Sequence, residues 1–153
     1  MAAPLIEDSI DVTASPEAVW SVISDLKRMG EWSPQCKKMV VFGGEVKQGA
    51  RTLNVNRRGP LFWPTTAKVV AFEPNREIAF RIAENRTVWS YRIEPTETGS
   101  RVTESRTAAG GTTTTVSAFL VDKVFGGNDS FEEELRAGIR ETLGKVKRAA
   151  EGA

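Results

Sequence analysis

The stretch SFEEELRAGIRETLGKVKRAA, residues 130–150, decides the fold class. Its apolar residues recur every three or four positions, which is the spacing of one helix face: Phe131, Leu135, Ile139, Leu143 and Val146. Ser130 and Glu133 have the spacing of a capping box. The sequence therefore predicts an amphipathic helix from about Ser130 to Ala150, whose apolar face must be covered by other elements.

An antiparallel β-sheet is predicted to supply that cover. Residues 5–13 alternate with Ile6, Ile10 and Val12 on one side, which indicates a half-buried strand with Asp8 as the discordant position. From Cys36 to about residue 107, β-rich runs are separated by turn signals at short spacing, which predicts six further strands. The turn signals are Gly43–Gly44, Gly59–Pro60, Pro74–Asn75, Glu84–Asn85 and the segment from Pro95 to Gly99.

Short helices are expected around the sheet. Ser15 is a suitable N-cap before Pro16, and apolar residues at helical spacing follow up to Leu26. A turn or helical fragment is expected before Pro34, and another short helix over 116–125. The resulting fold class is α+β: a strongly curved, seven-stranded antiparallel sheet wrapped around the C-terminal helix, in one domain over residues 1–153.

Composition excludes several classes of function. The 153 residues contain no histidine, which excludes His-based catalytic triads and His-rich metal sites. The single cysteine, Cys36, can form neither an intrachain disulfide nor a cysteine-cluster zinc site. Lysine and arginine total 21 against 20 acidic residues, a net charge of +1 that offers no field for nucleic acid.

The expected location is the cytoplasm. The chain begins MAAPLIED, with acids by position 7, and holds no apolar run long enough to insert into a membrane. No phosphate-binding loop or metal-ligand cluster appears, so no cofactor is predicted.

Several segments resemble the START-type helix-grip superfamily, in particular its bacterial polyketide cyclase/dehydrase-like branch, often called SRPBCC. They are IDVTASPEAVW (10–20), EWSP (31–34), GAR (49–51), NRRG (56–59), Glu73–Pro74, WSYRIEP (89–95) and VTE (102–104). The resemblance implies a helix-grip fold with a cavity between the sheet and the long helix. It implies no single function, because members include lipid carriers, plant hormone receptors and aromatase/cyclases.

Strand alternation predicts which side chains face this cavity. Charged residues mark the outer face, so the opposite parity is predicted to be inside: Ala67, Val69, Ala71, Ile78, Phe80, Ile82, Trp89, Tyr91, Ile93, Val102, Glu104 and Arg106. Two of these are charged, and they either form a structural ion pair or contact a ligand. We expect Arg106 to be the nearest cation to Glu104 and to keep it ionised at neutral pH.

Three further segments leave alternatives open. On the third strand, apolar parity turns Leu53 and Val55 inward, whereas the resemblance turns Thr52, Asn54 and Asn56 inward, and we favour the latter. Leu61–Phe62–Trp63 either forms a hairpin loop that gates the pocket mouth or begins the next strand with Trp63 in the core. Phe119 and its neighbours form either a second apolar flap over the cavity or ordinary core.

The leading functional hypothesis is a carrier or sensor that binds a hydrophobic small molecule such as a lipid, polyketide or aromatic metabolite. Its candidate ligand-binding residues are Asn54, Asn56, Trp63, Ala67, Val69, Phe80, Trp89, Tyr91, Glu104, Arg106 and Phe119. The alternative is a polyketide cyclase or dehydrase with Glu104 or Tyr91 as general acid or base and Arg106 stabilising an enolate oxygen. A third possibility is a regulatory protein that binds a protein partner whose identity the sequence does not predict.

Overall fold

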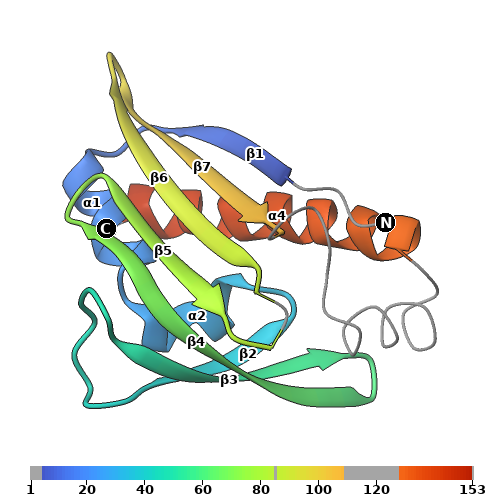
Figure 1. The fold of residues 1–153 in the computed structure, drawn as a ribbon. Helices are drawn as coiled ribbons and strands as arrows, with labels where there is room; N and C mark the ends of the chain where they lie inside the picture. Colours follow the sequence, from blue (N-terminus) through green and yellow to red (C-terminus); the bar gives the residue numbers. More distant parts are fainter. Residues whose placement is uncertain (1–4, 85, 109–127, 153) are drawn as a thin grey trace.

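The computed structural model describes residues 5–84, 86–108 and 128–152, and its main element is a seven-stranded antiparallel sheet (Figure 1). The strands are β1 (Leu5–Val12), β2 (Cys36–Val41), β3 (Arg51–Arg58), β4 (Leu61–Glu73), β5 (Glu77–Ile82), β6 (Val88–Thr96) and β7 (Gly99–Thr107). Their order in the sheet is β1-β7-β6-β5-β4-β3-β2, so consecutive strands from β2 to β7 are neighbours and β1 pairs with the last. The predicted antiparallel sheet is confirmed.

The curved sheet wraps around the long C-terminal helix, α4 (Asn128–Glu151) (Figure 1). Four of the five residues of the predicted apolar stripe of α4 are buried, with Leu135, Ile139, Leu143 and Val146 each at most 6% exposed. The side chain of the fifth, Phe131, lies outside the described part of the structure. These side chains join the core formed by the inner face of the sheet. The helix-grip arrangement is therefore confirmed, and it leaves the space between α4 and the sheet to be filled by side chains or by a ligand.

Short helices cover the end of the sheet after β1. The first, α1 (Pro16–Ile23), begins as predicted: Ser15 Oγ accepts a hydrogen bond from the Ala18 amide at 3.2 Å. A single 3-10 turn, Leu26–Arg28, then leads into α2 (Met29–Trp32). The helix predicted over 116–125 lies outside the described residues, and so does Phe119. No helix in the described part of the chain is long and apolar enough to cross a membrane.

The strand parity agrees with the prediction for most inner positions. Val69, Ile78 and Val102 are fully buried, and on β3 the register favoured by the resemblance holds, with Thr52 and Asn54 at 1% exposed. Ala71 is an exception, being half-buried, because the β4–β5 register shifts between Val69 and Ala71. Phe72 packs against the core instead, edge-on to Trp20 with ring centroids 5.3 Å apart.

Asp8, the discordant position of β1, has a partner on the helix. Its carboxylate accepts a hydrogen bond from Arg140 of α4 at 2.9 Å, and this contact lowers the pKa of Asp8. The side chain remains 40% exposed, so it is not a buried charge. Asp8 thus connects the edge strand to the outer side of α4.

Two local expectations need correction. Leu61–Phe62–Trp63 is not a hairpin loop, because Gly59 and Pro60 alone make the turn and all three residues pair with β3. Pro95 lies within β6 and pairs in register with Ser100, so the turn to β7 comes after Thr96. In both places a tight turn suffices, because antiparallel neighbours can be joined by about two residues.

Candidate functional site

A cavity of about 100 Å³ lies between the sheet and α4. The apolar side chains that line it come from α2, β2, β5, β6 and α4: Met29, Met39, Phe80, Ile82, Trp89, Leu135 and Ile139. The polar lining residues converge from several elements on the same space: Ser33, Gln35, Cys36, Asn54, Asn56, Thr65, Tyr91, Glu104, Glu134 and Thr142. An apolar cavity with a few convergent polar groups is the usual composition of a small-molecule site.

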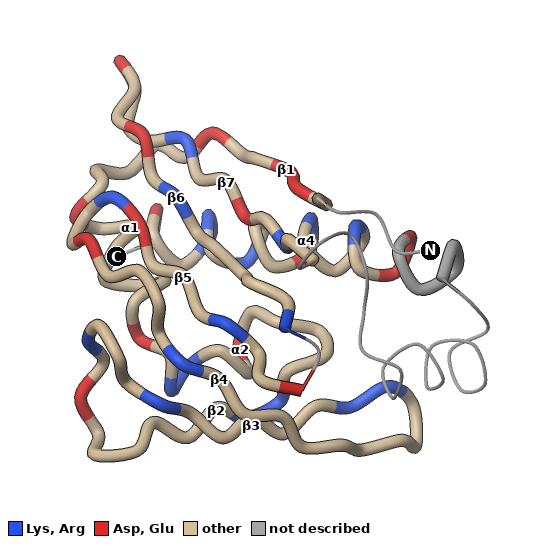
Figure 2. The backbone as a smooth tube through the Cα atoms, viewed as in Figure 1, with Lys and Arg blue, Asp and Glu red and all other residues tan. Residues whose placement is uncertain are grey.

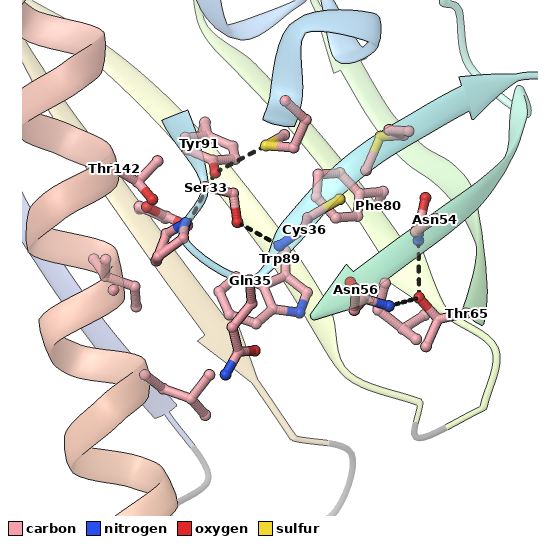
Figure 3. A pocket seen from close by; sticks show the side chains of 18 of the residues that line it. Ser33, Gln35, Cys36, Asn54, Asn56, Thr65, Phe80, Trp89, Tyr91 and Thr142 are labelled. Carbon is pink, nitrogen blue, oxygen red and sulfur yellow. Dashed lines mark hydrogen bonds between the residues drawn. The ribbon is translucent and has the colours of Figure 1, made fainter. Parts of the chain in front are cut away.

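One polar wall of the cavity is a hydrogen-bonded cluster on β3 and β4 (Figure 3). Asn54 and Asn56 both donate to Thr65 Oγ1, at 3.2 and 2.9 Å. The Asn54 carbonyl in turn accepts a hydrogen bond from the Thr52 hydroxyl at 2.8 Å. Because Thr65 Oγ1 already accepts two bonds, its hydroxyl proton is left to donate to another acceptor. The cluster therefore leaves the hydroxyl proton of a cavity-lining residue free to donate.

The other polar wall is the pair Tyr91 and Glu104, which lie opposite each other on β6 and β7. The Tyr91 hydroxyl donates to Glu104 Oε2 at 3.0 Å and lies 3.8 Å from the sulfur of Met29. Among the described residues, no group bonds to the buried Oε1 atom of Glu104. The carboxyl group of this cavity-lining residue thus has one satisfied and one unsatisfied oxygen, and a buried unsatisfied oxygen calls for an explanation.

Burial raises the pKa of Glu104 to about 8, against a smaller opposing effect from the Tyr91 hydrogen bond. At neutral pH the carboxyl group is therefore mostly protonated. The expectation that Arg106 keeps it ionised is wrong, because burial and Tyr91, rather than a guanidinium, set this pKa. In the protonated form a carboxyl group also donates one hydrogen bond.

The segment between α2 and β2 forms the third wall. Ser33 Oγ accepts a hydrogen bond from the Cys36 amide at 3.0 Å, which places the Cys36 side chain at the cavity (Figure 3). Burial raises the pKa of the Cys36 thiol to about 11. At neutral pH the thiol is protonated, so Cys36 contributes polarizable surface rather than a nucleophile.

The structure brings together six of the residues that the sequence proposes for the site: Asn54, Asn56, Phe80, Trp89, Tyr91 and Glu104. Four others lie elsewhere: Trp63, Ala67, Val69 and Arg106 do not line the cavity. Ala67 and Val69 are core residues behind it, and Trp63 pairs with Asn56 at the far end of β4. Arg106 is buried on the inner face of β7, beside Trp89 in the register.

Several lining residues are not anticipated by the sequence prediction. Met29, Cys36 and Met39 line the cavity because α2 folds back against β2, a contact that no local pattern indicates. Thr142 does carry a signal: it follows Ile139 by three positions and so lies on the apolar stripe of α4. A polar residue on a buried helix face points to a cavity or a polar partner.

A surface groove of about 470 Å³ adjoins the cavity. The two share four lining residues, Pro34, Gln35, Glu134 and Gly138. Arg58, at the end of β3, bonds to Glu134 of α4 across this groove. These four shared residues lie between the cavity and the groove, on the α2–β2 segment and on α4.

The sequence matches the family model described as polyketide cyclase / dehydrase and lipid transport over residues 4–151. The chain belongs to this family. The resemblance to the polyketide cyclase/dehydrase-like branch is thereby confirmed. No curated protein sequence matches the chain.

Solved structures similar to this family member cover nearly all of it. The Polyketide_cyc-like protein Cgl2372 from Corynebacterium glutamicum is 31% identical, with 97% of this chain and 92% of that chain covered and a TM-score of 0.64. KanY is 20% identical, with 99% and 100% covered and a TM-score of 0.73. The di-domain ARO/CYC StfQ from the steffimycin biosynthetic pathway is 16% identical and has a TM-score of 0.75. The comparison with StfQ covers 97% of this chain and 51% of the StfQ chain, which is about half of its length.

Proposed function

We propose that the protein binds a hydrophobic small molecule that carries a hydrogen-bond acceptor, in the cavity between the sheet and α4. The observation that carries the proposal is Glu104, a carboxyl group that is mostly protonated at neutral pH and has one oxygen unbonded among the described residues. A buried polar group of this kind costs stability unless something bonds to it. A ligand carbonyl would accept the hydrogen bond that the protonated carboxyl can donate.

The apolar lining determines the rest of the ligand. Trp89, Phe80 and Ile139 supply flat and aliphatic surface around the space next to Glu104. The enclosed volume of about 100 Å³ is close to that of cavities that hold a single aromatic ring. A larger ligand would place one ring in the cavity and extend past the four residues shared with the groove, so that its remainder lies in the groove. Ring-bearing ketones, including polyketide fragments and aromatic metabolites, have this chemistry.

The binding test uses a matched pair of probes, acetophenone and ethylbenzene, which share a ring and differ mainly in the carbonyl group. We expect acetophenone to bind more tightly, by roughly three- to tenfold, because only it accepts a hydrogen bond from Glu104. Isothermal titration calorimetry at pH 6, where Glu104 is protonated, measures both affinities. Equal affinities for the two probes would show that Glu104 does not donate a hydrogen bond to the bound ligand.

Two tryptophan variants locate the bound probe. Trp89 lines the cavity and Trp63 does not, so Trp89→Phe should lose most of the quenching of tryptophan emission that acetophenone causes. Trp63→Phe should retain it. If neither probe binds, or if both variants respond alike, the cavity is not the binding site.

A second candidate function is catalysis of cyclisation or dehydration. It is favoured by the pKa of Glu104, about 8, because a group with a pKa near the working pH both gives and takes protons efficiently. In the dehydration of a β-hydroxy ketone, ionised Glu104 would remove the proton next to the carbonyl. The same carboxyl would then return that proton to the hydroxyl group, which leaves as water while the double bond forms.

The test of catalysis uses 4-hydroxy-4-phenylbutan-2-one, whose loss of water produces a conjugated ketone that absorbs in the ultraviolet. An enzyme should accelerate the reaction above the solvent rate, and Glu104→Gln should lose on the order of 10²-fold. Glu97, exposed in the β6–β7 turn, supplies the control variant Glu97→Gln, which should keep the full rate. A rate equal to that in solvent, or one unchanged in Glu104→Gln, would leave binding as the function.

A further inference from the structure

A row of basic side chains crosses the outer face of the sheet, the face opposite the cavity. Arg51 of β3 lies directly opposite Lys68 of β4, and Lys68 lies directly opposite Arg81 of β5. All three residues are exposed. Figure 2 shows blue segments, which mark lysine or arginine, on each of the three neighbouring strands β3, β4 and β5.

The row lies in a hollow rather than on a flat surface. The hollow has a volume of about 470 Å³, and its charged lining is entirely basic: Arg51, Lys68, Arg81 and Arg86. Phe42 continues the row on the β2 side, where its amide bonds to the Arg51 carbonyl, and its side chain is 56% exposed. Volumes of this size are typical of sites for small molecules.

This arrangement costs the protein stability in the absence of an anion. Like charges directly opposite each other on neighbouring strands repel, and Lys68 has such a neighbour on both sides. Among the described residues, none of the four cations forms a salt bridge. The acid at the rim, Glu84, bonds to the amide and hydroxyl of Thr66, both at 2.8 Å.

We propose that this hollow binds a ligand with two or more phosphate groups. Neighbouring strands lie about 4.8 Å apart, so the row from Arg51 to Arg81 spans about 10 Å, enough for more than one phosphate. Arginine at each end offers the planar fork that matches phosphate oxygens, and Lys68 supplies a point charge between them. The exposed ring of Phe42 provides an apolar contact for the remainder of such a ligand. The site is separate from the cavity, so the two proposals stand independently.

The binding test compares two triple variants with the same change in net charge. Arg51→Gln/Lys68→Gln/Arg81→Gln removes the row, whereas Arg76→Gln/Arg136→Gln/Arg148→Gln removes three exposed arginines elsewhere. Tripolyphosphate, titrated at low ionic strength by calorimetry, should bind the first variant at least roughly tenfold more weakly than the natural protein. The second variant should match the natural protein within about twofold. Absence of tripolyphosphate binding, or equal weakening in both variants, would overturn the proposal.

A stability measurement separates a binding role from a structural one. Without phosphate, Lys68→Gln should raise the melting temperature by roughly 2 °C, because it removes two repulsive pairs. The same variant should show a smaller rise on addition of tripolyphosphate than the natural protein. If Lys68→Gln lowers the melting temperature without phosphate, the row is structural and the proposal fails.

Vesicles distinguish the source of the phosphate. Vesicles that contain phosphatidylinositol bisphosphate should bind and be displaced by tripolyphosphate if the ligand is a lipid headgroup. No vesicle binding, with tripolyphosphate still bound, indicates a soluble phosphate ester. Equal binding to phosphatidylserine vesicles without competition by tripolyphosphate would mean a general attraction to anionic surfaces and would overturn the site.

Discussion

Glu104→Gln is expected to remove a pH dependence of stability on the order of 5 kcal/mol. Burial raises the pKa of Glu104 from 4.5 to about 8, so the folded protein holds this proton over a range in which the unfolded chain releases it. Each pH unit between the two pKa values is worth about 1.4 kcal/mol. The contribution of this group to the free energy of unfolding should therefore be fully present below about pH 4.5 and should fall as the pH rises to about 8.

The sign of the effect distinguishes Glu104 from an ordinary surface carboxylate. A salt-bridged acid has a lowered pKa and loses its stabilising effect as the pH falls, as expected for Glu151, whose pKa Lys147 and Thr13 lower to about 2. Glu104 does the reverse and loses stability as the pH rises. The glutamine side chain does not titrate in this range. In Glu104→Gln the free energy of unfolding should therefore change less between pH 5 and pH 8 than in the natural protein.

Urea unfolding from pH 5 to pH 8, followed by tryptophan emission, measures the effect in both proteins. Glu97→Gln is the matched control, because Glu97 is exposed in the β6–β7 turn, and its profile should parallel that of the natural protein. Tyr91→Phe removes the hydrogen bond that lowers the pKa of Glu104, so it should extend the decline to higher pH. Parallel profiles for Glu104→Gln and the natural protein would show that Glu104 is not buried as a neutral acid.

The fold could be predicted because its determinants are local. Each of these determinants acts within a few residues: the 3.6-residue period of α4, the Ser15 cap and the turns at glycine and proline. Together they predict the order of helices and strands, and a sheet wrapped around α4 is the simplest way for that order to bury its apolar faces. At Leu61–Phe62–Trp63 the sequence left a hairpin loop and the start of a strand both open, and the structure has the strand. A position next to the turn signal Gly59–Pro60 is compatible with a loop. The conformation of these residues is decided instead by their pairing with β3.

The candidate site was only partly predictable. Strand parity placed Tyr91 and Glu104 on the inner face but could not say how deeply each is buried. The depth of burial is the main cause of the raised pKa of Glu104. The prediction that Arg106 keeps Glu104 ionised was therefore wrong. The walls formed by Met29 and Cys36 depend on how α2 packs against β2, a long-range contact that the sequence pattern does not encode.

That packing depends on Gly30, and Gly30→Ala is expected to cost about 3 kcal/mol of stability. A Cβ atom at Gly30 would clash with the carbonyl oxygen of Lys37, which is backbone and has no flexible end to move aside. Lys37 lies within the register shift between Cys36 and Lys38 on β2, and such a shift bends a strand locally. The clash would push α2 away from β2 and displace the cavity wall that contains Met29 and Cys36.

The same chemical change in α4 should have the opposite sign, which makes Gly144→Ala the matched control. A Cβ atom at Gly144 would meet only the end of the Arg148 side chain, at an ordinary distance of 3.7 Å. Alanine in a helix interior is more favourable than glycine by up to about 1 kcal/mol, so this variant should be more stable than the natural protein. Urea unfolding of both variants measures the difference, and acetophenone titration should show weakened binding in Gly30→Ala alone. If the two variants unfold at the same urea concentration, alanine is tolerated at Gly30. The predicted clash with the backbone of Lys37 would then not occur, and the close approach of α2 to β2 would not shape the cavity.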